Sequence, residues 1–150
     1  MGNRRWTSLY GWDFKNYVLG TMFYRYVSEN ITSYINDGEL EPGNMDFDYR
    51  QMSDADAEEA RQGLIEEKGF FILPSELFCN VQENCNNDSA FFTDKEGMRK
   101  SVKENLNEFL EMIFNHIEES AKGSESESIF EGLFDDFDVN NNKLGSTVAK

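Results

Sequence analysis

Apolar side chains recur at helical spacing over residues 13–35. One row runs through Phe14, Val18 and Met22, and a second runs from Leu19 to Ile35 in steps of four. Residues four apart share a helix face, so the pattern predicts a helix. The two rows cover most of its circumference, which is typical of a central, buried helix.

The ends and the middle of this helix carry their own signals. Asp13 is a typical N-cap, which leaves residues 1–11 as a loosely structured lead-in. Gly20 lies mid-helix, where glycine costs roughly 1 kcal/mol, so we expect another helix to approach closely there. Residues 37–49, rich in glycine and asparagine, read as a loop.

The middle of the chain predicts shorter elements. Ser53 and Asp56 resemble a capping box, followed by a helix over 54–67 that stops near Gly69. The apolar run 70–73 is either a brief strand or a buried extended segment, since periodicity cannot separate the two.

Two helix starts are expected after this run. Ser75 is the expected cap of a short helix that ends near Gln82. Thr93 and Glu96 offer a capping box for the clearest helix, over 102–117. Its apolar face holds Val102, Leu106, Phe109, Leu110, Ile113, Phe114 and Ile117.

The last part of the chain predicts a stop, a short helix and a tail. Gly123 ends the long helix, and Ile129, Leu133 and Phe137 recur in step over 129–137. The fold class is therefore mainly α, a helical bundle-like domain with room for one short β-strand pair. The length of 150 residues fits one domain, 1–150.

The net charge of the chain limits the kinds of partner that it can bind. The net charge is −15, from 29 acidic and 14 basic side chains, which argues against autonomous DNA binding through phosphates. It favours basic partners. The first 35 residues differ, since they hold four basic and two acidic side chains.

The cysteines and the histidine do not suggest a metal site. Cys79 and Cys85 are six apart without zinc-ligand spacing, and His116 is the only histidine. We expect two free thiols in a reducing cytoplasm and a surface or boundary histidine. Without a signal peptide pattern or an apolar run of about 20 residues, the expected location is cytoplasmic.

Other candidate chemistry has a simpler explanation. A calcium loop beginning at Asp136 would need glycine at Asn141 and glutamate at Thr147, so we expect no metal there. No glycine-rich phosphate loop is present. Phe23, Tyr24, Tyr26 and Tyr34 could stack on bases, but their helical spacing favours core packing.

Three ordered blocks nevertheless carry a family resemblance. Residues 11–30, beginning Gly-Trp-Asp-Phe, resemble the opening helix of the modification (methylase) subunit of type I restriction–modification systems. Residues 68–78 resemble that family's lysine–glycine–aromatic, Pro-Ser, Leu-Phe segment. Residues 133–138 and 144–148 resemble its Leu-Phe-x-Asp-Phe-Asp and Leu-Gly-x-Thr-Val blocks. Residues 1–10 do not match the helical segment that usually precedes these blocks.

The resemblance implies an N-terminal helical domain that joins the methylase to the specificity subunit and helps close the enzyme around DNA. Its implied partners are the specificity subunit, a second methylase subunit, the restriction subunit and DNA. Adenine methylation from S-adenosylmethionine belongs to a catalytic domain with an Asn-Pro-Pro motif. This chain has only Pro42 and Pro74, so no residue here takes a catalytic or cofactor-binding role.

Two basic residues are the candidates for contact with a partner or DNA. Lys15 and Arg25 lie on the first helix, within the first 35 residues, which carry a net positive charge in an acidic chain. The alternative is a free-standing acidic interaction protein, such as an inhibitor that occupies a DNA-binding surface. A gene that continues in frame into a methyltransferase domain would separate the two.

Overall fold

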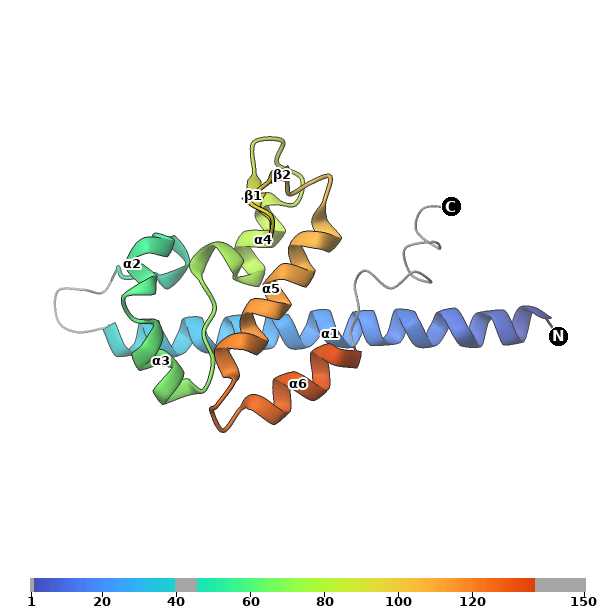
Figure 1. The fold of residues 1–150 in the computed structure, drawn as a ribbon, viewed down its shortest axis with the longest axis horizontal. Coiled ribbons are helices and arrows are strands. Elements are labelled where there is room, and N and C mark those ends of the chain that lie inside the picture. Colours follow the sequence, from blue (N-terminus) through green and yellow to red (C-terminus); the bar gives the residue numbers. More distant parts are fainter. Residues whose placement is uncertain (1, 40–45, 137–150) are drawn as a thin grey trace.

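The computed structural model describes residues 2–39 and 46–136, with side chains over 19–39 and 46–131. In this part the chain is mainly α, as predicted, with one two-stranded sheet (Figure 1). The elements are α1 Gly2–Glu39, η1 Tyr49–Gln51, α2 Asp54–Glu58, α3 Arg61–Lys68, η2 Pro74–Glu76, α4 Phe78–Asn84, β1 Phe91–Thr93, β2 Arg99–Ser101, α5 Leu106–Ala121 and α6 Glu127–Asp136.

Helix α1 runs along the length of the molecule (Figure 1), and α4, η1 and α6 pack against it. It begins at Gly2, so the predicted lead-in over 1–11 and the cap at Asp13 are wrong. It also extends to Glu39, into the predicted loop. Its inner face buries Gly20, Tyr24, Val27 and Ile31, and the Tyr24 hydroxyl donates a hydrogen bond to the Glu76 carbonyl.

The predicted helix over 54–67 is two helices, α2 and α3. The Ser53 hydroxyl accepts the Asp56 N–H at 3.1 Å, as the capping signal predicted. The helix breaks at Ala60 because its N–H bonds only three residues back, to Ala57. As predicted, α3 stops at Gly69, with φ of 88°; the Ser126 hydroxyl fills the place that a Cβ would need.

The segment 70–73 is extended and mostly buried, without a strand partner in the described chain, which confirms the second of the two alternatives. Side chains satisfy its backbone. Ser120 Oγ accepts the Phe71 N–H at 3.0 Å, and the Tyr49 hydroxyl donates to the Ile72 carbonyl at 2.6 Å.

Ser75 does not cap a helix, contrary to prediction. Its hydroxyl donates to Asp54 at 2.5 Å within η2, and α4 begins only at Phe78. The Phe78 N–H donates instead to the hydroxyl of Ser28 on α1, at 3.1 Å. The cap of α4 therefore comes from another helix, 50 residues away.

Thr93 also begins no helix; it ends β1, which pairs antiparallel with β2 and places Phe92 opposite Lys100. The Asp94 carboxylate accepts the N–H groups of Glu96 and Met98, and Gly97 has φ of 84°. An aspartate that accepts backbone N–H groups of following residues and a glycine in the left-handed conformation are features of turns. They explain why this segment forms a hairpin and not the start of a helix.

Helix α5 begins at Leu106, later than predicted, and Val102 is buried outside it. Gly123, at φ of 82°, follows its end as expected. On α6, Phe130 packs against Phe23 and Phe70, with ring centroids 5.6 and 5.1 Å away. Ile129, the first member of the predicted row, is 58% exposed, whereas the side chains of Leu133 and Phe137 lie outside the described residues.

The main core lies between α1, the extended segment, α4 and α5 (Figure 1). Its fully buried side chains include Tyr24, Ile31, Tyr49, Ile72, Leu77, Ile113 and Ile117. The calcium-loop-like stretch after Asp136 and the Leu-Gly-x-Thr-Val block over 144–148 fall outside the described residues.

Candidate partner-binding surface

An apolar stripe on α1 remains open to solvent. Leu19, Met22 and Tyr26 are 48%, 62% and 63% exposed, and their spacing of three and four residues places them along one side of the helix. The prediction that this helix is buried nearly all round is wrong on this side. The core interpretation of the aromatic side chains holds for Tyr24 but not for Tyr26 or Tyr34.

Arg25 lies beside this stripe, on the surface. Its Nε is 3.0 Å from Glu29 Oε1, and its guanidinium stands 5.9 Å from the centroid of the Phe78 ring. Because both charged side chains are about two-thirds exposed, this pair adds little stability and can be exchanged for another partner. Lys15 lies on the same helix, before the first residue whose side chain is described.

A recess of about 290 Å³ opens next to Arg25, between α1, η1 and α4. On its rim Arg50 pairs with Asp48 at 2.7 Å, and hydrogen bonds from Arg50 lower the pKa of that carboxyl. Cys79 lines the recess. Cys79 and Cys85 are both free and half-buried, as predicted.

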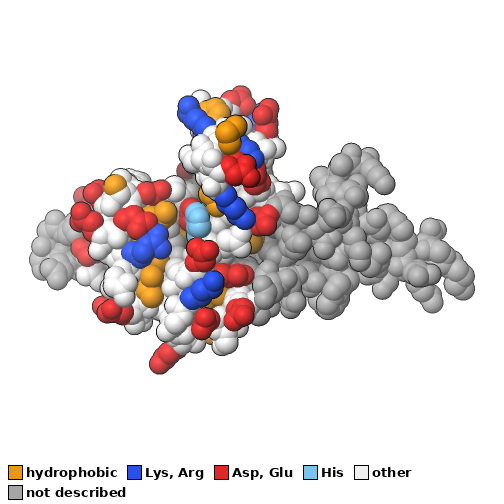
Figure 2. All heavy atoms as spheres, viewed as in Figure 1, with side chains coloured by type: hydrophobic (Ala, Val, Ile, Leu, Met, Phe, Trp, Pro, Cys, Tyr) orange, Lys and Arg blue, Asp and Glu red, His pale blue; other side chains and the backbone are white. Residues whose placement is uncertain are grey.

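Sequence reasoning missed a pair between Glu76 and His116. Glu76 Oε2 lies 2.8 Å from His116 Nδ1; the carboxyl side chain is 7% exposed and the imidazole 46%. The hydrogen bond to Glu76 raises the pKa of His116 against the opposing effect of burial. His116 is an exposed residue, as one of the two predicted alternatives stated, and Figure 2 shows the histidine at the surface with acidic side chains close by.

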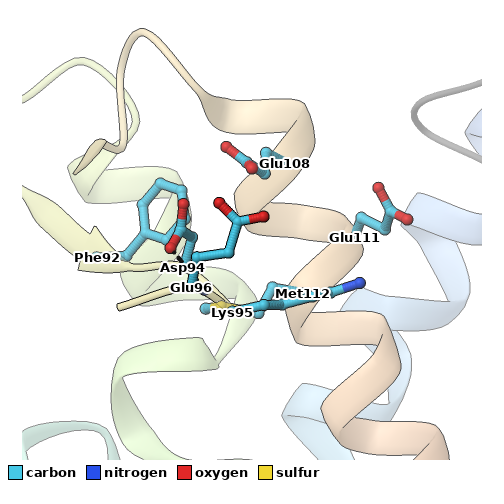
Figure 3. A pocket seen from close by; sticks show the side chains of 7 residues that line it. All are labelled: Phe92, Asp94, Lys95, Glu96, Glu108, Glu111 and Met112. Atoms are coloured by element: carbon cyan, nitrogen blue, oxygen red, sulfur yellow. Dashed lines mark hydrogen bonds between the residues drawn. The ribbon is translucent and has the colours of Figure 1, made fainter. Parts of the chain in front are cut away.

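A second recess lies under the hairpin, shown in Figure 3. Asp94 and Glu96 from the turn and Glu108 and Glu111 from α5 line it. Lys100 Nζ holds the two elements together, at 2.9 Å from Asp94 and 2.8 Å from Glu108. The hydrogen bond from Lys100 is the main cause of a lowered pKa at Asp94.

The described side chains do not form a metal centre. Among the residues that the structure describes, no three histidine, cysteine or acidic side chains are grouped as metal ligands would be. Within the same residues, no helix combines the length and apolar character that crossing a bilayer requires. What the surface offers is an apolar stripe and acidic hollows, which suit protein contacts.

Comparison with known proteins agrees with the resemblance found in the sequence. Residues 5–150 match the family model of the HsdM N-terminal domain. The chain is similar to the type I restriction enzyme MpnII methylase subunit of Mycoplasma pneumoniae (strain ATCC 29342 / M129), with 43% identity over 147 residues. This match covers 93% of the chain but 24% of that relative, so the chain spans about a quarter of its length. No solved structure gave a significant match. The chain therefore belongs to the HsdM N-terminal domain family.

Proposed function

We propose that residues 1–150 form one helical domain through which an adenine-specific type I DNA methylase subunit joins its specificity subunit and closes around DNA. A second methylase subunit and the restriction subunit complete the assembly, which works in the cytoplasm. The exposed stripe of Leu19, Met22 and Tyr26 on α1 carries this proposal. Large exposed apolar side chains that line up along one helix are typical of surfaces that a partner covers.

Methyl transfer is not assigned to this chain. The complete subunit would use S-adenosylmethionine, but the residues present do not fit that cofactor. In the family that the chain resembles, an Asn-Pro-Pro motif holds the flipped adenine in its pocket. Of the two prolines here, Pro74 is buried in η2 and preceded by Leu73, and Pro42 is preceded by Glu41. The hollows nearest the hairpin are lined with carboxylates rather than a glycine-rich loop. The isolated chain should therefore show no saturable heat on titration with S-adenosylmethionine.

Co-purification with the specificity subunit tests the assembly role. The wild-type chain should be retained, and Met22→Asp should lose retention because it places a charge in the covered stripe. Met98→Asp is the matched control: Met98 is 58% exposed, close to the 62% of Met22, but lies on the hairpin. If the two variants are retained equally, the exposed stripe of α1 does not contact the specificity subunit.

The basic residues of α1 call for a separate comparison. Lys15→Glu and Arg25→Glu should weaken retention if these cations face the specificity subunit or the DNA that it holds. The isolated chain should bind DNA weakly and with steep salt dependence, since few cations oppose its net charge of −15. Tight DNA binding by the chain alone, or no association with the specificity subunit, would favour the free-standing acidic interaction protein instead.

A further inference from the structure

One oxygen of the Glu76 carboxylate accepts no hydrogen bond within the described part of the chain. Glu76 Oε2 pairs with His116, and Oε1 has no hydrogen-bond partner in the parts of the chain that the structure describes. The side chain is only 7% exposed. A buried carboxylate is costly unless donors surround it, so the fold holds an acceptor ready for a further donor.

This carboxylate lines a groove of about 650 Å³ between η2, the hairpin and α5. Both apolar and polar side chains line the groove. The apolar ones include Val81, Phe92, Val102, Phe109 and Met112, and the polar ones include Asp54, Ser75, Asn84, Asn87, Ser89 and His116. Phe92 and Met112 also line the recess of Figure 3, so the two hollows adjoin.

The charge of the two hollows is strongly one-sided. They are lined by the carboxylates of Asp54, Glu76, Asp94, Glu96, Glu108 and Glu111. The cations that line them are Lys95 and, when protonated, His116. Lys100 is already bonded to Asp94 and Glu108. A surface of this sign repels nucleic acid and attracts a basic chain.

We propose that this groove binds a basic segment of a partner protein, with one arginine guanidinium against Glu76 and its aliphatic stem over Phe92 and Met112. Arginine fits best because its charge is weakly hydrated and its planar fork matches a carboxylate. The apolar side chains that line the groove suit the methylene stem. The groove goes beyond the assembly role proposed for α1 and uses other elements.

Nuclear magnetic resonance on the labelled full chain tests this directly. N-acetyl-arginine amide should shift the His116 ring and the amides of Asn84 and Met112 in a saturable manner. N-acetyl-citrulline amide, which has the same shape without the charge, should leave them unchanged. No response to the arginine probe, an equal response to both probes, or a stronger response to a DNA duplex would overturn the proposal.

Substitutions locate the site. Glu76→Gln should lower the affinity for the arginine probe about tenfold or more, because it removes the buried charge. Glu83→Gln, at an exposed residue of α4 outside the groove, should change it by less than about twofold. If Glu76→Gln does not fold, Glu111→Gln should still weaken the probe about threefold. Affinity unchanged in whichever variant is folded would refute the assignment, whereas retention by the specificity subunit would be unaffected.

Discussion

At the residue scale, the Glu76–His116 pair predicts a pH-dependent stability. The pKa of His116 is raised above its ordinary value of 6.5 by the hydrogen bond to Glu76. Protonation therefore favours the folded state: the contribution is complete below about pH 6.5 and is lost as pH rises through the folded pKa. The difference in free energy of unfolding between wild type and His116→Gln should shrink over that window in urea titrations.

The companion measurement separates this pair from general charge effects. Glu119 is exposed on the same helix and raises the pKa of His116 less than Glu76 does. Glu119→Gln should therefore leave most of the pH dependence of stability in place. If the difference in free energy of unfolding between wild type and His116→Gln instead grows with pH, the folded protein favours the neutral imidazole.

Single residues differ in how well the sequence predicted them. The cap at Ser53 and the stops at Gly69 and Gly123 were predictable because a local pattern determines each. Glu76 and His116 are 40 residues apart, and neither stands in a motif, so only the packing of η2 on α5 brings them together. The same holds for Ser28, whose role depends on where α4 begins.

At the element scale, the start of α4 depends on Ser28. Ser28 is 3% exposed, and its hydroxyl accepts the Phe78 N–H at 3.1 Å. Ser28→Ala should cost about 1 kcal/mol of unfolding free energy, as the loss of an N-cap does, and should speed amide exchange in α4. Ser33→Ala, at an exposed site of the same helix, should change neither. Equal effects of the two would mean that α4 begins without this bond.

Helix α5 carries the core, and an isoleucine pair tests this. Ile113 is completely buried, whereas Ile129 on α6 is 58% exposed. Ile113→Ala should cost about 2–5 kcal/mol because it leaves a cavity, and Ile129→Ala should cost less than about 0.5–1 kcal/mol. Chemical denaturation of the two variants measures this, and similar costs would place α5 at the surface.

Elements with a strong apolar period were predictable, whereas the hairpin and the start of α4 were not. The rows of α1 and α5 gave helices in the right places, although neither start was right. The pattern Thr93–Glu96 fits a capping box equally well, but Asp94 bonds the backbone ahead and Gly97 takes a left-handed conformation. Pairing with β2 and packing of Phe92 on Phe109, at 4.8 Å between ring centroids, then favour the hairpin.

At the scale of the whole molecule, net charge opposes compactness. A chain of −15 repels itself, and salt screens that repulsion. Raising sodium chloride from about 10 mM to about 150 mM shortens the screening length from about 30 to 8 Å. The melting temperature should therefore rise by a few degrees, and by the same amount in potassium chloride. A fall would mean that the ion pairs, such as Lys100 with Asp94 and Glu108, outweigh the repulsion.

The buried extended segment has a consequence for synthesis of the chain on the ribosome. The bonds that hold this middle region reach backward to Ser28 and Tyr49 and forward to Ser120 and Ser124, over separations from 23 to 55 residues. Until Ser120 and Ser124 have left the exit tunnel, the Phe71 N–H and the Gly69 carbonyl lack these partners, and Phe70, Phe71 and Ile72 lack the helix that packs on them. The nascent chain must therefore carry these apolar residues exposed while α5 is being made, an interval in which a chaperone that binds apolar segments has its target.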